Sequence, residues 1–296
     1  MSQLEEYAIF VSIARAGSMT AASRQVGLAK SAVSKKLSDL EQRLGVQLLE
    51  RTTRSMTLTQ AGEVFLTRAE QILDDVAEAE AEAQSGAKAL SGRLRIAAPL
   101  SFGLLVLKPM LSKFIQEHPE IHLEIDFADR KVDLVQEGFD MALRIGTLTD
   151  SSLIARKVGS VRHIAAASPS FWDTIGRPKE PIDLLPMPCL RYNNNNRARQ
   201  IDYKTPGDNL RSFNPNVRIQ ASNGEILASL ASDGLGYLVE PDFILKPFLD
   251  DGRLEPVLLD TFWEEMDVSL IYPPSRRVSA RARSFSNYLL ECFTSK

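Results

Sequence analysis

The stretch that decides the fold runs from Met19 to Gly45 and reads MTAASRQVGLAKSAVSKKLSDLEQRLG. Its first part predicts a short helix that stops at Gly27, because glycine accepts the left-handed conformation with which helices end. A second helix begins about four residues later, where we expect the Ser31 hydroxyl to cap the free amides. The stretch therefore predicts two helices joined by a tight turn.

The second helix has one apolar and one polar face. Its apolar residues recur at intervals of four, three and four, which places them on one stripe: Val33, Leu37, Leu40 and Leu44. The opposite side carries Ser31, Lys35, Ser38 and Gln42, with Ser34 on the flank. Such side chains can reach bases and phosphates in a DNA major groove. The pattern fits a recognition helix and an ordinary surface helix equally well.

The charge is distributed unevenly along the 296 residues. Residues 1–62 hold eight Lys and Arg against five Asp and Glu, whereas residues 63–91 hold two against seven. A basic N-terminal module joined to the body through an acidic helix is typical of a nucleic-acid reader that carries a second domain. We expect neither a membrane span nor an export signal, and the two cysteines predict reduced thiols of a cytoplasmic protein.

The residues on either side extend the module. A first helix is predicted over residues 3–15, and the segment VQLLERTTRSMTLTQAG at 46–62 predicts a basic polar hairpin with a return strand. A helix-turn-helix followed by such a hairpin is a winged helix-turn-helix. Arginines in a wing can lie along phosphates or enter a narrow minor groove.

The run at residues 21–62 closely resembles the DNA-binding module of LysR-type transcriptional regulators. The shared motifs are A-V-S at 32–34, L-E-x-x-L-G at 40–45 and T-x-A-G at 59–62. The resemblance implies that four residues face bases or adjacent phosphates, namely Lys30, Ser31, Ser34 and Lys35. It implies that four more lie on the DNA backbone, namely Ser18, Thr20, Arg51 and Arg54. Many relatives have Gln and Pro where this chain has Lys30 and Ser31, so the base preference of these two positions does not carry over from the family.

A long helix is predicted from about Gln60 to Ala89, with Thr59 as its cap. Apolar residues along it follow a heptad pattern, which indicates packing against a partner helix. The proposed dimer contacts are Phe65, Ala69, Ile72 and Val76. Packing of the helix on its own domain is the alternative. The resemblance implies a homodimer and a homotetramer, with RNA polymerase as a further candidate partner.

From Arg93 onward, strands alternate with helices, including a short helix at Val132 to Gln136, and this predicts parallel α/β sheets. The resemblance implies two lobes like those of periplasmic binding proteins, with the chain crossing near Val161 and Met266. The predicted organisation is an N-terminal all-α winged helix-turn-helix at 1–59, a linker helix and hinge at 60–91, and a C-terminal α/β regulatory domain at 92–296. Lobe I covers about 92–161 and 267–296, and lobe II about 162–266.

A ligand is expected at the carboxyl ends of the strands, between the lobes. The loops that lie there, and the family's cleft, select the candidate effector residues Ser101, Phe102, Asp129, Arg144, Gly146, Tyr192, Asn223 and Pro241. An arginine opposite helix N-termini favours an anionic metabolite such as an aromatic carboxylate.

Motifs for other chemistry are not found. The sequence holds no phosphate-binding glycine motif, no nucleophile elbow and no closely spaced Cys/His cluster, so we expect no catalytic residue, metal or cofactor. Pro119 breaks the helix that would align His118 with His122. The sequence favours a regulator of transcription that binds promoter DNA and a small-molecule effector. The alternative is a small-molecule binding protein or α/β enzyme with an accessory DNA-binding module.

Overall fold

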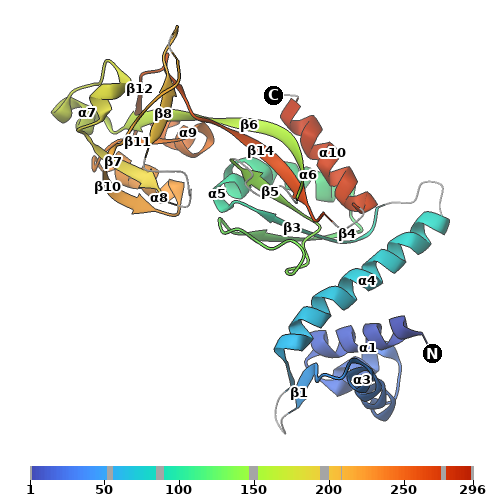
Figure 1. Cartoon of the computed structure of the whole chain (residues 1–296). Helices are drawn as coiled ribbons and strands as arrows, with labels where there is room; N and C mark the ends of the chain where they lie inside the picture. The colour runs from blue at the N-terminus through green and yellow to red at the C-terminus, as the bar shows by residue number, and fades with distance from the viewer. Residues whose placement is uncertain are drawn as a thin grey trace.

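The computed structural model describes residues 2–51, 56–84, 90–146, 153–193, 200–207, 209–274 and 278–294. Figure 1 shows a small helical domain at the N-terminus, a long helix leading away from it, and a larger body of two lobes. Among the described residues, no helix combines the length and the hydropathy needed to cross a lipid bilayer.

The N-terminal domain is built from helices that end at glycines. Its elements are α1 (Gln3–Ala16), α2 (Met19–Val26), α3 (Lys30–Leu44), β1 (Leu49–Arg51) and β2 (Met56–Leu58). Gly17, Gly27 and Gly45 each adopt a positive φ directly after a helix, as the sequence predicts. The buried core contains the α3 residues Val33, Leu37 and Leu40.

One prediction for α3 is wrong. Ala29 is the N-cap and makes no side-chain hydrogen bond, and Ser31 lies inside the helix. The helix starts two residues earlier than a cap at Ser31 implies, so the amides of its first turn have no side-chain cap.

The linker helix α4 (Gln60–Gln84) follows the antiparallel β1–β2 hairpin. The Thr59 hydroxyl accepts a hydrogen bond from the Gly62 amide at 3.0 Å, so Thr59 caps this helix as predicted. The predicted end at Ala89 lies outside the described residues.

The first half of α4 belongs to the core of the N-terminal domain. Ala69 is completely buried there, and the Phe65 ring packs at 5.3 Å from the rings of Tyr7 and Phe10. Assigning Ala69 to a dimer seam is therefore wrong, because it is completely buried, whereas Phe65 packs on α1 but stays partly exposed. Ile72 is 40% exposed, and Val76 is partly exposed, so these two remain available.

Lobe I is a mixed sheet covered by helices. Its elements are β3 (Gly92–Ala98), α5 (Leu100–Phe102), the π-helix η1 (Gly103–Leu107), α6 (Lys108–Glu117), β4 (Ile121–Phe127), β5 (Met141–Ile145) and α10 (Ala280–Thr294). β3 pairs in parallel with β4 and β5. Phe114 of α6 and Phe285 of α10 pack together at 4.9 Å between ring centres, in the main core.

Two long strands join the lobes (Figure 1). β6 (Ile154–Ala167) leads into lobe II and β14 (Glu265–Tyr272) returns, and Val161 faces Met266 where they cross. β14 runs antiparallel to β5 and to β6. The predicted parallel pairing is found for β3 with β4 and β5, whereas β14 is antiparallel because the chain has to leave the first lobe and come back through the same sheet.

Lobe II contains the rest of the chain. Its elements are α7 (Pro169–Ile175), η2 (Pro181–Leu184), β7 (Pro188–Tyr192), β8 (Ile201–Lys204), β9 (Arg211–Phe213), β10 (Asn216–Ala221), α8 (Gly224–Ser232), β11 (Leu238–Pro241), α9 (Asp242–Asp250), β12 (Glu255–Val257) and β13 (Phe262–Trp263). The sequence did not predict β8, β9, β12 or β13. In lobe I, residues 132–136 form a turn and not the predicted helix.

Candidate DNA-binding and effector sites

The outward face of α3 carries the predicted DNA contacts. Lys30, Ser31 and Lys35 are exposed on it, and Ser34 is half-buried. Because α3 has no side-chain cap and no acidic residue in its first turn, its N-terminal amides can donate hydrogen bonds to an anion such as a phosphate.

The other basic residues of α3 are engaged within the domain. Lys36 forms an ion pair with Glu5 at 2.9 Å, and Arg43 pairs with Glu6 at 2.7 Å, so both fasten α3 to α1. The bond to Glu6 raises the pKa of Arg43. Lys30 and Lys35 are therefore the lysines that α3 leaves facing outward.

The remaining predicted DNA residues divide into two groups. Ser18 is the N-cap of α2, where its hydroxyl accepts a hydrogen bond from the Ala21 amide, and Thr20 is exposed on the next turn. The side chains of Arg51 and Arg54 lie outside the described residues.

The two lobes touch at the residues predicted to bind the effector. The Asn223 side-chain amide donates to the Ser101 hydroxyl at 3.5 Å, and these two side chains lie in different lobes. Beside them, the Phe102 ring packs edge-on against Phe243 of α9 at 5.2 Å. Asn223 also caps α8 by accepting from the Ile226 amide at 3.0 Å. Ser101, Phe102 and Asn223 are thus brought together as the sequence predicts.

Arg144 is the unusual cation of lobe I. It is half-buried and makes no hydrogen bond or ion pair within the described part of the chain. Burial, together with the nearby charge of Arg130, lowers its pKa, while Asp129 opposes this effect. Asp129 itself accepts a hydrogen bond from the Leu100 amide at 3.3 Å, which fixes the start of α5. Asp129, which the sequence predicts to bind the effector, therefore also has a structural role.

A residue that the sequence analysis missed supports the lobe II side. Glu240 is fully buried at the end of β11, directly before Pro241. Burial raises the pKa of Glu240 to about 8, although Arg191 and a hydrogen bond from the Tyr192 backbone act in the opposite direction. Glu240 therefore fixes the backbone of the predicted residue Tyr192. An acid within the apolar run YLVEP was the signal that could have revealed it.

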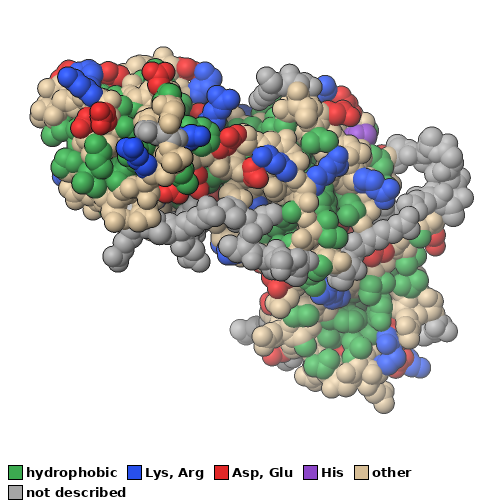
Figure 2. Space-filling model, turned by 45° about the horizontal axis from the view of Figure 1, so that its top comes forward, with side chains coloured by type: hydrophobic (Ala, Val, Ile, Leu, Met, Phe, Trp, Pro, Cys, Tyr) green, Lys and Arg blue, Asp and Glu red, His purple; other side chains and the backbone are tan. Residues whose placement is uncertain are grey.

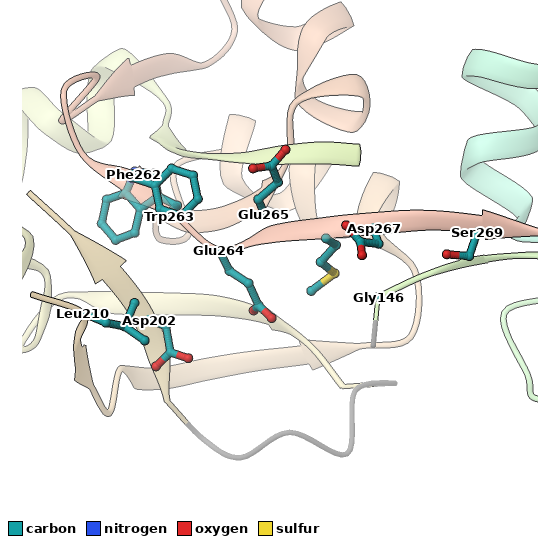
Figure 3. Close-up of a pocket in the computed structure, with 10 residues that line it drawn as sticks. Gly146, Asp202, Leu210, Phe262, Trp263, Glu264, Glu265, Asp267 and Ser269 are labelled. Atoms are coloured by element: carbon teal, nitrogen blue, oxygen red, sulfur yellow. The ribbon is translucent and has the colours of Figure 1, made fainter. Parts of the chain in front are cut away.

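A hollow lies along the return strand between the lobes. It measures about 460 Å³ and includes Gly146, Asp202, Phe262 and Glu264 in its lining. Figure 3 shows Asp202 of β8 and Glu264, which lies between β13 and β14, extending into it, with Phe262 at one end. Of the predicted effector residues, only Gly146 lines this hollow.

Family comparisons decide the identity of the two domains. Residues 4–63 match the bacterial regulatory helix-turn-helix protein of the lysR family, and residues 87–293 match the LysR substrate binding domain. The chain belongs to the LysR family. It is a transcriptional regulator with a DNA-binding domain and an effector-binding domain.

Relatives match the LysR-family chain over its full length. An uncharacterized HTH-type transcriptional regulator of Haemophilus influenzae is 34% identical, over 97% of this chain and 99% of that protein. A transcriptional repressor of Pseudomonas aeruginosa is 32% identical, over 99% and 93%. The structure of CrgA from Neisseria meningitidis, a LysR-type regulator, is 31% identical with a TM-score of 0.61, over 99% of each chain.

Two further observations concern metal binding and the side chain of His163. In the residues that the structure describes, no group of three or more His, Cys, Asp and Glu side chains is placed to hold a metal ion. His163 is half-buried on β6, where its Nδ1 lies 2.6 Å from the Glu264 carbonyl oxygen. Burial lowers the pKa of His163 to about 4, so it is neutral at neutral pH.

Proposed function

We propose that this chain binds double-stranded promoter DNA as a dimer and that a small-molecule effector between its lobes modulates the binding. The observation that carries the proposal is the outward face of α3, where Lys30, Ser31 and Lys35 remain exposed while Lys36 and Arg43 pair with α1. Ser34 lies beside them, and Ser18, Thr20, Arg51 and Arg54 serve the DNA backbone.

The test is selection of an operator from a random duplex library by the full-length protein, followed by protection mapping. We expect protection of two half-sites separated by whole helical turns, because a two-fold symmetric dimer presents two recognition helices. Uniform binding without any selected sequence would contradict the proposed readout by α3. Since DNA is the partner, we place the protein in the cytoplasm.

We propose that the effector is an anionic metabolite, with an aromatic carboxylate as the favoured class. The half-buried Arg144 side chain forms no ion pair with the described residues, although the charges of Asp129 and Glu137 act on it, and this supports a ligand carboxylate there. Phe102 and Tyr192 supply aromatic surface, and Ser101, Asn223 and the backbone at Gly146 supply polar groups. Asp129 and Pro241 complete the proposed lining.

A thermal-shift screen of the full-length protein against small carboxylates tests this ligand class. We expect a saturable rise in Tm that Arg144→Ala abolishes, because a ligand that binds only the folded state stabilises it. The exposed Arg283, on α10, provides the control substitution Arg283→Ala. Stabilisation by neutral compounds alone would exclude an anionic effector.

The dimer is proposed to form through the outer face of α4. Figure 2 shows hydrophobic side chains gathered on the lower part of the molecule, and the exposed apolar residues of α4 include Val64 at 60% and Ile72 at 40%. Such residues on one helix favour a partner helix. Ile72 and Val76 keep the role that the sequence assigns them, and Val64 joins them. Pairing of two dimers into a tetramer, and contact with RNA polymerase, are proposals of the same kind.

A further inference from the structure

The linker helix meets lobe I through a polar stripe. Thr67, Glu70, Gln71 and Asp74 follow one another at helical spacing on α4, and together with lobe I residues they line a narrow crevice. Gly138 of lobe I fits closely against this stripe, since a Cβ at that position would lie 2.3 Å from the Thr67 methyl group. The side chains that meet here are therefore packed at contact distance.

Glu70 is the centre of the contact because it binds cations from both domains. Its Oε1 pairs with Arg15 of α1 at 3.0 Å, and its Oε2 pairs with Arg93 of β3. The Glu70 side chain is only 12% exposed. Arg93 in turn pairs with Glu124 of β4, donating a hydrogen bond of 2.7 Å from one terminal nitrogen, while its Nε lies 2.7 Å from the other carboxylate oxygen. One chain of ion pairs thus runs from the DNA-binding domain into the sheet of lobe I.

Asp74 lies one turn further along α4 and lines the same crevice as Arg93. Burial raises its pKa, while the positive charges of Arg281 and Arg93 act against this effect. Arg281 is a buried residue of α10, and its guanidinium lies beside Gly92 at the start of β3. Two acids of the linker helix therefore face two arginines of lobe I.

A contact made of charges can open at low cost in free energy. Removing charged groups from water nearly cancels their mutual attraction, so such an interface stabilises the docked state far less than an apolar interface of equal area. The charges still fix one relative orientation of the two domains, because wrongly placed charges repel. These properties suit a joint that docks and releases.

The same contact is connected directly to the proposed effector site. Arg93 is the second residue of β3, and β3 leads through Pro99 into α5, which carries Ser101 and Phe102. A strand rises about 3.3 Å per residue, so Arg93 and Ser101 lie roughly 25 Å apart along one strand and its continuation. A displacement of β3 at its ligand end would move Arg93 against Glu70.

We propose that Glu70 and Asp74 of α4, with Arg93 and Arg281 of lobe I, form a reversible ionic latch that docks the DNA-binding domain on the regulatory domain. Movement of lobe I around its ligand opens the latch and frees the linker helix. The second statement depends on the proposed effector response, whereas the first depends only on the contacts described above.

The test is a distance measurement between spin labels on the full-length protein. Labels at Gln25→Cys of α2 and Lys113→Cys of α6 occupy exposed positions in the two domains, and Cys292→Ser removes the half-buried native thiol. An excess of unlabelled protein ensures that each assembly contains one labelled chain. We expect one narrow distance distribution for the otherwise unchanged protein.

The double substitution Glu70→Ala with Asp74→Ala is expected to broaden the distribution and shift it to longer distances. Adding Arg93→Ala to this variant should change it no further, because all three side chains act in one contact. Glu80→Ala, at an exposed position of the same helix, serves as the control and should leave the distribution narrow. Circular dichroism confirms that each variant is folded.

An unchanged distribution in the Glu70 and Asp74 variant would overturn the latch, as would equal broadening by Glu80→Ala. Operator binding is measured on the same samples. If the distances contradict the latch but operator binding is intact, the proposed function is unaffected. If the unsubstituted protein does not bind an operator, the proposed function is contradicted, and the measured distances still test the latch.

Discussion

Lys35 and Lys36 are neighbours on α3, yet their surroundings assign them opposite roles. Lys35 is exposed on the outward face, whereas the Lys36 side chain is 12% exposed and pairs with Glu5. In the sequence, both lysines contribute equally to the positive charge of the N-terminal module. The two roles differ because consecutive residues point to different sides of the helix and because α1 packs on the side of Lys36.

We therefore expect Lys35→Ala to weaken operator binding by about 1 kcal/mol, roughly fivefold, and to lower the salt slope by about 1, because one phosphate contact is lost. Lys36→Ala is the matched control and should leave both quantities unchanged, while removing a surface ion pair worth about 0.5 kcal/mol. Fluorescence anisotropy at several salt concentrations measures both. Equal losses in the two variants would contradict the assignment of the faces.

Glu240 allows a prediction on pH. Its pKa is about 8 in the folded chain and near the ordinary value of 4.5 in the unfolded chain. The folded state therefore holds the proton more tightly, and the stability of the protein falls as the pH rises from about 4.5 to 8. Glu240→Gln cannot ionise and still offers an oxygen to the Tyr192 amide.

We expect Glu240→Gln to raise Tm by about 3 °C at pH 8.5, corresponding to about 1 kcal/mol, and to change it little at pH 5.5. Differential scanning calorimetry at both pH values measures the effect, with the exposed Glu120→Gln as the control. A gain of equal size at both pH values would show that the ionisation of Glu240 is not its cause.

At the scale of helices and strands, the apolar periodicity of the sequence predicts those elements whose formation depends on residues close by in the chain. The helices at 3–16, 19–26 and 30–44 follow from apolar spacing and from glycines that end them. The short strands β8, β9, β12 and β13 were missed because two to four residues carry too little periodicity to be recognised. The antiparallel direction of β14 depends on a return from the other lobe, which no local pattern contains.

The linker helix shows the same limit in its seam. The heptad spacing of Phe65, Ala69, Ile72 and Val76 is real, but the first two pack on α1 and the last two do not. A heptad pattern states which residues share a face, and it does not state which neighbour covers that face. The strand-end rule likewise predicts that Ser101 and Asn223 lie close together, and they do, while the buried Glu240 could be found only in the structure.

We predict that Ile72→Glu separates the dimer, because a carboxylate placed in an apolar helix contact must be desolvated. Sedimentation equilibrium of the full-length protein measures the change as a rise in the dissociation constant of at least about tenfold, or roughly 1.4 kcal/mol. Ile182→Glu, at a similarly exposed apolar residue of lobe II, is the control. Dissociation by neither variant would show that the dimer forms elsewhere.

At the scale of the whole molecule, the strands β6 and β14 join the lobes while the Ser101–Asn223 contact marks where the lobes touch. A ligand that binds between the lobes selects one of their relative positions, and it can shift the protein only by its difference in affinity for the two arrangements. DNA binding must respond to the same arrangements for the protein to act as a regulator.

This linkage requires reciprocity, which can be measured once the thermal-shift screen has identified a ligand. If the ligand changes operator affinity by a given factor, typically 5- to 150-fold for about 1 to 3 kcal/mol of coupling, the operator must change ligand affinity by the same factor. Calorimetric titration of the full-length protein with the ligand, with and without a saturating operator duplex, measures the second factor. A ligand that stabilises the protein but shows equal affinity in both titrations occupies a site that is not coupled to DNA, and the lobes would then regulate through some other molecule.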